Sequence, residues 1–180
     1  MGTLVTTEAA EDTPVTLAEA QVQCRMGDIT DHDTLLARLI DAATAEYEQY
    51  AGITLVSRTM TLYLDGFGDL DVDLQTYPVQ SVGSVKYDDA DNSEQILGSS
   101  SYFTKLQGMS PYIRAVDYWP SAYTSKPSSV RVEFVAGYQT VDAIPDDAKQ
   151  AILVRVLEMF EAEEGTHHSK LPGQSRRRFN

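Results

Sequence analysis

The sequence predicts an α+β fold in which a small helical bundle carries an inserted antiparallel β-sheet region. Near both ends of the chain, apolar residues recur at three- and four-residue spacing, whereas between residues 53 and 138 they alternate with polar residues. The strand-like runs of this middle region are short, lie close together and are separated by turn residues, which is typical of antiparallel sheets. Helices and strands do not alternate along the chain, so a parallel nucleotide-binding sheet is not expected.

The first helix is expected at residues 14–26. Thr16 is followed three residues later by Glu19, and this spacing predicts a capping box that satisfies backbone N–H groups at the helix start. Gly27 is expected to end the helix, because glycine readily takes the left-handed conformation found after helix ends. Residues 1–13 are small and polar, and we expect them to form a flexible N-terminal arm.

The second helix is expected at residues 30–51. Thr30 or Asp31 would cap it, since both side chains can accept a hydrogen bond from the first helical turn. Leucine, isoleucine, alanine and tyrosine side chains then form a stripe at helical spacing that includes Tyr50. Gly52 follows the last residue of this stripe and is expected to end the helix.

The β insertion is expected at residues 53–138, with about five to six short strands. Apolar and polar residues alternate in the runs near 56–65, 69–74 and 130–134, and turn residues such as Gly66, Pro78 and Gly137 follow or precede runs. The runs lie near residues 56–65, 69–74, 79–87, 102–104, 112–116 and 130–134.

The closing helix is expected at residues 145–164. Pro145 suits its first position, where a missing N–H has no consequence. Leu153, Val154 and Leu157 point away from the main apolar stripe, so this helix is apolar on more than one side. We therefore expect these three residues to contact a neighbouring copy of the protein or a second face of the bundle.

The charge of the 180-residue chain is unevenly distributed. The net charge is −13, and because the last 15 residues carry four cations and no acid, residues 1–165 carry −17. An acidic body disfavours non-specific DNA binding, whereas a basic tail is typical of a segment that docks on an acidic partner or a polyanion. A solvated terminus is the alternative. The expected docking residues of the 165–180 tail are Lys170, Arg176, Arg177, Arg178 and Phe179.

No catalytic, cofactor-binding or metal-binding residue is expected. Cys24 is the only cysteine, which excludes an internal disulfide, and it is expected to be a small core residue of a protein from a reducing compartment. His32, His167 and His168 lack metal-ligand spacing. No phosphate-binding glycine motif, signal sequence or membrane-length apolar run is present.

Two acidic runs permit a calcium interpretation, and the first would also serve a metal-dependent hydrolase. Neither run has the glycine and glutamate positions of an EF-hand loop. Strand alternation would place the first set on one face, where a solvated surface, a bound cation and a basic partner are all possible. The two runs are Asp69, Asp71 and Asp73, and Asp89, Asp91 and Ser93.

Aromatic residues gather in the loop at residues 117–127. Tyr118, Trp119 and Tyr123 combine apolar area with a polar group, and such side chains are enriched at protein interfaces. We expect this loop to form part of a subunit interface. The alternative is that some of these side chains cover the sheet.

Taken together and in order, several short segments between residues 14 and 164 resemble the head–tail connector (adaptor) family of tailed phages and gene transfer agents. Residues 88–128 show the resemblance least. The segments are Pro14–Ala20, Asp33–Ala43, Tyr50–Gly52, Tyr63–Phe67, Tyr77–Val82, Val85–Asp88, Trp119–Pro120, Phe134–Tyr138, Ile144–Pro145, Ala148 and Ala151–Leu153.

This resemblance implies a structural protein of the virion neck, made in the host cytoplasm, with no catalysis, no cofactor and no membrane. Family members form a closed ring of about twelve copies through head-to-tail contacts. The ring binds the portal on one side and a stopper or tail-terminator protein on the other, and DNA passes through without sequence-specific binding. The C-terminal segment, here residues 165–180, is the one that reaches the portal. The alternative is another neck or tail-completion ring protein.

Overall fold

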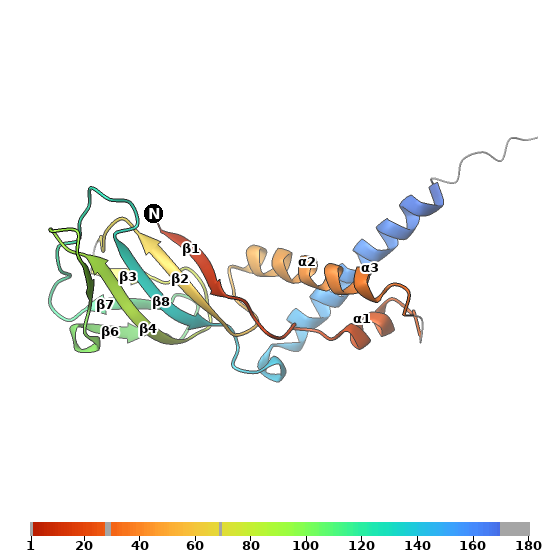
Figure 1. The fold of residues 1–180 in the computed structure, drawn as a ribbon. Coiled ribbons are helices and arrows are strands. Elements are labelled where there is room, and N and C mark those ends of the chain that lie inside the picture. Colours follow the sequence, from red (N-terminus) through yellow and green to blue (C-terminus); the bar gives the residue numbers. More distant parts are fainter. Residues whose placement is uncertain (1, 28–29, 69, 170–180) are drawn as a thin grey trace, which may run out of the picture.

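The chain folds into an elongated molecule with strands at one end and helices at the other (Figure 1). The computed structural model describes residues 2–27, 30–68 and 70–169. Within this part it contains three α-helices and eight β-strands, so the α+β prediction is confirmed. The arrangement is not a plain helical bundle, because the helices and the sheets each enclose a hydrophobic cluster of their own.

The first helix, α1 (Leu17–Gln23), has the predicted capping box. The backbone N–H of Thr16 donates to Glu19 Oε2 at 2.7 Å, and the N–H of Glu19 donates to Thr16 Oγ1 at 3.2 Å. The helix ends three residues earlier than predicted. Arg25 already takes a left-handed conformation with φ of 56°, so the helical path stops before Gly27.

The second helix, α2 (Asp33–Ala51), begins later than predicted, and neither Thr30 nor Asp31 is its N-cap. His32 occupies that position without a side-chain cap hydrogen bond. The predicted end is confirmed, because Gly52 follows the helix in the left-handed conformation with φ of 66°.

The third helix, α3 (Asp146–Ser169), extends five residues beyond the predicted end. Its buried side chains recur every four residues and pack in the helical cluster with buried residues of α2. These side chains are Ala148, Ile152, Val156 and Phe160 on α3, and Leu36, Leu39, Ile40 and Ala43 on α2.

Two antiparallel sheets form the β end, and side chains from both sheets share one buried cluster. The larger sheet has the strand order β1-β2-β8-β4-β5, and the smaller has the order β3-β7-β6. The strands are β1 (Thr3–Glu8), β2 (Arg58–Leu64), β3 (Asp71–Asp73), β4 (Val79–Asp88), β5 (Glu94–Ile96), β6 (Tyr102–Lys105), β7 (Tyr112–Ala115) and β8 (Val130–Ala136).

Two strands differ from the sequence-based expectation. Residues 3–8 of the predicted flexible arm form β1, which pairs antiparallel with β2 at the edge of the larger sheet. The region 53–138 contains seven strands, because β5 was not predicted. All three residues of β5 are exposed, so it has no alternation of apolar and polar residues to reveal it.

A partly buried ion pair joins the helical end to the β end. Glu48 on α2 and Arg58 on β2 lie 2.7 Å apart, and their side chains are only 10% and 18% exposed, respectively. Glu48 Oε1 also accepts the backbone N–H of Leu55 at 2.7 Å. Leu55 belongs to the helical cluster and Met60 to the β cluster, so Glu48 fixes the short segment that passes between them.

We predict that Glu48→Ala lowers the free energy of unfolding by about 2–4 kcal/mol, because it leaves Arg58 and the Leu55 N–H without this partner. Glu46→Ala is the matched control on the same helix. Glu46 and its partner Arg155 are 53% and 44% exposed, so its removal should cost under about 0.5 kcal/mol. Urea denaturation measures both changes, and equal losses in the two variants would contradict the junction role.

Candidate interaction surfaces

The loop at residues 117–127 is anchored by Trp119 and displays Tyr118. The Trp119 ring stacks on Phe67 with a centroid separation of 4.6 Å and an interplanar angle of 4°, and its Nε1–H donates to the Leu70 carbonyl at 3.1 Å. Trp119 therefore covers the β cluster. Tyr118 is 82% exposed and is free for contact with another chain.

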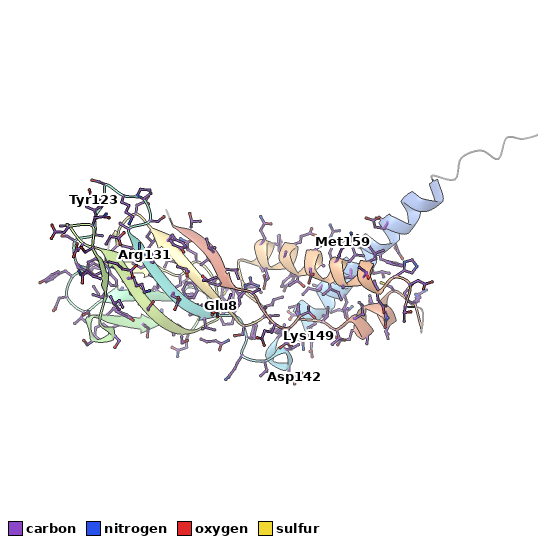
Figure 2. The ribbon with its side chains drawn as sticks, viewed as in Figure 1. Glu8, Tyr123, Arg131, Asp142, Lys149 and Met159 are labelled. Carbon is purple, nitrogen blue, oxygen red and sulfur yellow. The ribbon has the colours of Figure 1, made fainter. Side chains whose placement is uncertain are left out.

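Asp88 holds the other end of this loop in place. Its carboxylate is buried and accepts Arg131 Nη2 and Lys126 Nζ, each at 2.7 Å. Its backbone carbonyl accepts the Tyr123 N–H at 2.8 Å. Figure 2 shows Tyr123 and Arg131 together at the β end. Tyr123 is half-buried, so backbone anchoring accounts for its position.

Hydrogen bonds from Arg131 and then Lys126 hold the pKa of the Asp88 carboxyl well below its usual range. The negative charge of Asp88 is thus stabilised by folding, and the loop depends on it. The hydrogen bond between Asp88 and Arg131 also raises the pKa of Arg131.

Exposed apolar side chains form a surface beside this loop, which we call the β-end patch: Leu70, Phe103, Val116 and Tyr118. An open hollow of about 830 Å³ adjoins it, lined in part by Trp119 and by the ion pair between Asp71 and Arg114. The sequence analysis identified Tyr118 but missed the other three. The three come from separate segments of the sequence, and only the folded chain brings them to one end.

The acidic strand face predicted near residues 69–74 exists, and its partner is a cation of the same chain. Asp71 and Asp73 are exposed on β3, on either side of the buried Val72. Asp71 forms an ion pair with Arg114 on β7, whose hydrogen bond lowers the pKa of the Asp71 carboxyl. Asp73 accepts the backbone N–H of Gln75 at 2.7 Å, and Asp69 lies outside the described residues.

The second acidic run forms a turn. Asp89 accepts the backbone N–H groups of Asp91 and Ser93 and the side-chain amide of Gln95, and these hydrogen bonds lower the pKa of its carboxyl. Within residues 2–27, 30–68 and 70–169, no group of three or more histidine, cysteine, aspartate and glutamate side chains is arranged to hold a metal ion. Cys24 is buried, and burial raises the pKa of its thiol.

On α3, the three residues expected at an interface differ in exposure. Leu153 and Leu157 are half-buried and pack against the helical cluster, whereas Val154 is 42% exposed. The second apolar face of α3 is therefore narrower than the sequence pattern indicates, because the helical cluster covers part of it.

A groove of about 260 Å³ between α2 and α3 adds a surface that sequence reasoning missed. Its mainly apolar wall includes Tyr47, Ala151 and Ile152, and Tyr50 at its rim is 92% exposed. Tyr50 belongs to the apolar stripe of α2 by spacing. It lies in the last turn of α2, beyond the buried residues of that helix, and this position leaves its ring uncovered.

The expected docking residues of the tail, Lys170, Arg176, Arg177, Arg178 and Phe179, lie outside the described residues. None of the helices that the structure describes has the length and apolar character of a membrane span.

No protein-family model matches this chain, and no curated protein matches it in sequence. Solved structures do match. A chain in the virion of a native gene transfer agent particle is 24% identical with a TM-score of 0.76, and the match covers 88% of this chain and 84% of that one.

Two neck structures give the same result. A chain in the neck of an empty gene transfer agent particle, computed with C6 symmetry, has a TM-score of 0.75 and 24% identity over 88% of this chain and 84% of that one. A chain in the neck of the native particle, computed with C12 symmetry, has a TM-score of 0.73 and 23% identity, with 88% and 83% covered. The chain shares its fold with these particle proteins.

We predict that Asp88→Asn lowers the free energy of unfolding at pH 7 by about 2 kcal/mol, because charge-assisted hydrogen bonds to Arg131 and Lys126 are lost. The folded-state pKa of Asp88 lies below its unfolded value, so its stabilisation is complete above about pH 4. It declines as the pH falls from there towards the folded pKa.

The difference in free energy of unfolding between the unchanged protein and the Asp88→Asn variant should therefore narrow below about pH 4. Urea denaturation of both at pH 7, 5 and 3 measures this difference, and the other carboxylates cancel in the comparison. A gap that stays constant down to pH 3 would contradict the assignment.

Proposed function

We propose that this protein is a structural head–tail connector, an adaptor of a tailed phage or phage-like particle. The observation that supports the proposal is the fold similarity, which extends over 88% of the chain at TM-scores of 0.73–0.76 to chains from gene transfer agent particles. Two of these structures are particle necks, where the head meets the tail. The resemblance of residues 14–164 to the adaptor family favours the same location.

In this proposal the protein acts as a ring of about twelve identical copies. The necks of the similar particles were computed with C6 and C12 symmetry, which is the symmetry that such a ring would have. A ring needs two different surfaces on each copy, because its contacts are head-to-tail. Val154 on α3 and Tyr118 in the β-end patch are the two predicted interface residues that are exposed, by 42% and 82%, and they lie on elements at different ends of the molecule.

The ring would bind the portal on one side and a stopper or tail-terminator protein on the other, with DNA passing through its centre. The tail follows α3 in the sequence and carries four cations, whereas residues 1–165 carry −17. We assign the tail to an acidic surface of the portal. The acidic body would repel DNA, so DNA would pass through without being held.

A second candidate is another neck or tail-completion ring protein, because the same fold similarity and symmetry support it equally. The two candidates differ in their partner. Co-expression with the portal of the same particle, followed by affinity purification and electron microscopy, separates them. An adaptor gives a portal with a second ring attached, whereas binding only to tail components favours the second candidate.

We predict that Arg176→Glu, Arg177→Glu and Arg178→Glu together abolish attachment to the portal, because three attractive charges become repulsive. The fold should survive, since these residues lie beyond α3, and circular dichroism with urea denaturation checks this. Portal pull-down measures attachment. A control with all three residues changed to Lys keeps the charge and should bind, whereas normal binding by the Glu variant would refute the role of the tail.

We also predict that Val154→Glu prevents ring formation while the monomer stays folded. Val154 is 42% exposed, so a carboxylate is tolerated in the free subunit, with a stability change within about 0.5 kcal/mol. In a subunit interface the same carboxylate would be buried without a partner. Val22→Glu on α1, where the side chain is 79% exposed, is the control. Native mass spectrometry or particle images measure the rings, and intact rings of the Val154 variant would exclude this surface.

A further inference from the structure

Strand β1 is attached to the rest of its own chain by few side-chain contacts. Five of its six residues are exposed, and only Leu4 packs partly against the β cluster. Besides the backbone ladder to β2, its links are a hydroxyl pair between Thr7 and Thr61 at 2.7 Å and a hydrogen bond from Thr59 to Glu8 at 2.8 Å. The position of β1 thus depends mainly on backbone hydrogen bonds, which any copy of the same strand can supply.

Strand β2, in contrast, requires a partner along the edge that β1 covers. Met60 and Leu62 of β2 are buried in the β cluster, so β2 cannot leave the sheet. Without β1, the N–H and C=O groups of its outer edge would be unpaired and open to another strand. The outer edge of β2 is therefore fixed in place by the β cluster, whereas β1 is attached to that edge mainly through backbone hydrogen bonds.

The linker between β1 and the helical end is loosely packed. Residues 9–13 run from the end of β1, marked by Glu8 in Figure 2, and Ala10 is the only one of them that is half-buried. Hollows of about 310 and 270 Å³ border this linker. Glu11 and Asp12 line both hollows, and neither carboxylate has a hydrogen-bond or ion-pair partner within the part of the chain that the structure describes.

Pro14 and Val15 are buried and mark where the arm is fixed to the helical end. The five linker residues, four of them exposed, can span about 17 Å when extended, which is several times the spacing between neighbouring strands. The arm therefore has the length to reach a β2 edge outside its own subunit, and its release would uncover only two partly buried side chains, Leu4 at the β cluster and Ala10 at the helical cluster.

We propose that β1 is an exchangeable strand, and that in an assembly of this protein it pairs with β2 of a second copy. Exchange forms the same pairs, from Thr3 with Tyr63 to Thr6 with Met60, so it loses none of the backbone pairing between β1 and β2. In the ring proposed above, each copy would give β1 to the next and receive it from the previous one. The placement of the exchanged strands around a ring rests on the proposed function. The exchange of β1 between two copies does not depend on it.

Disulfide trapping at paired positions tests the exchange. Val5 faces Thr61 in the register of β1 and β2, and antiparallel partners lie close enough for a disulfide. In a Cys24→Ala background, Val5→Cys is placed in one protein and Thr61→Cys in another. The two proteins are mixed in urea at high concentration, refolded and oxidised. We expect a dimer whose cross-link joins positions 5 and 61, identified by mass spectrometry of the linked peptides.

Two controls make the result decisive. In the first control, one chain carries both Val5→Cys and Thr61→Cys and is oxidised as a dilute monomer, which shows that this pair can form a disulfide. Cysteines at Thr3 and Tyr63 give a second pair in the same register. Val22→Cys mixed with Thr61→Cys measures random collision, because Val22 is exposed on α1. Cross-linking at positions 5 and 61 no greater than this background, with the single-chain pairs oxidising normally, would overturn the exchange.

The exchange and the ring fail in different ways. Light scattering of the untreated protein with its portal reports ring assembly independently of any disulfide. If rings form but the disulfide between positions 5 and 61 joins only residues of one chain, the exchange is refuted and the proposed ring stands. If positions 5 and 61 of different chains are cross-linked but the protein never forms rings, the exchange is supported and the proposed ring is refuted.

Discussion

The partly buried contact of Glu48 with Arg58 and the Leu55 N–H is the constraint on which the shape of the molecule depends. Each end of the protein has its own hydrophobic cluster, and apolar burial alone would hold each end together without fixing one relative to the other. Glu48 supplies directional hydrogen bonds at the crossing point, and its burial makes them costly to break.

The segment that leads back from β8 to α3 lies beside the segment that leads from α2 to β2, and contacts between the two fix its position. The Tyr138 N–H donates to the Leu55 carbonyl at 2.8 Å, and Gly137 lies so close to Val56 that an added Cβ would be 2.5 Å from its carbonyl carbon. With φ of 106°, Gly137 also has a backbone conformation that other residues rarely adopt. Glycine at this position is what allows the two crossings to approach each other.

The sequence predicts the elements whose signals are local. The capping box of α1 and the glycine that ends α2 depend on residues within one or two turns, and both predictions are confirmed. In β4, Val79, Val82 and Val85 recur at three-residue spacing, which alone resembles a helix. Register shifts between Val79 and Ser81 and between Val82 and Ser84 absorb the extra residues in irregular pairings with β8.

Features that depend on distant partners could not be predicted from spacing. The strand β1 is polar and has only its pairing with β2, 50 or more residues away in the sequence, to define it. Sequence spacing leaves open whether Leu153 and Leu157 contact the bundle or a neighbouring copy. Both pack against the helical cluster, and a sequence pattern does not show how far neighbouring helices extend around α3. The β-end patch likewise combines residues from separate strands.

The ion pairs also explain why the basic tail differs from the rest of the chain. Six of the ten cations before residue 166 form ion pairs with carboxylates of the body: Arg58, Lys86, Arg114, Lys126, Arg131 and Arg155. These cations are used to hold the fold, and carboxylates such as Glu11 and Asp12 remain open to solvent. The body of the protein therefore stays acidic, because its 27 carboxylates outnumber its ten cations, whereas the last 15 residues carry four cations and no acid. In the proposed neck, the first property keeps DNA from binding and the second directs one end of the subunit to an acidic partner.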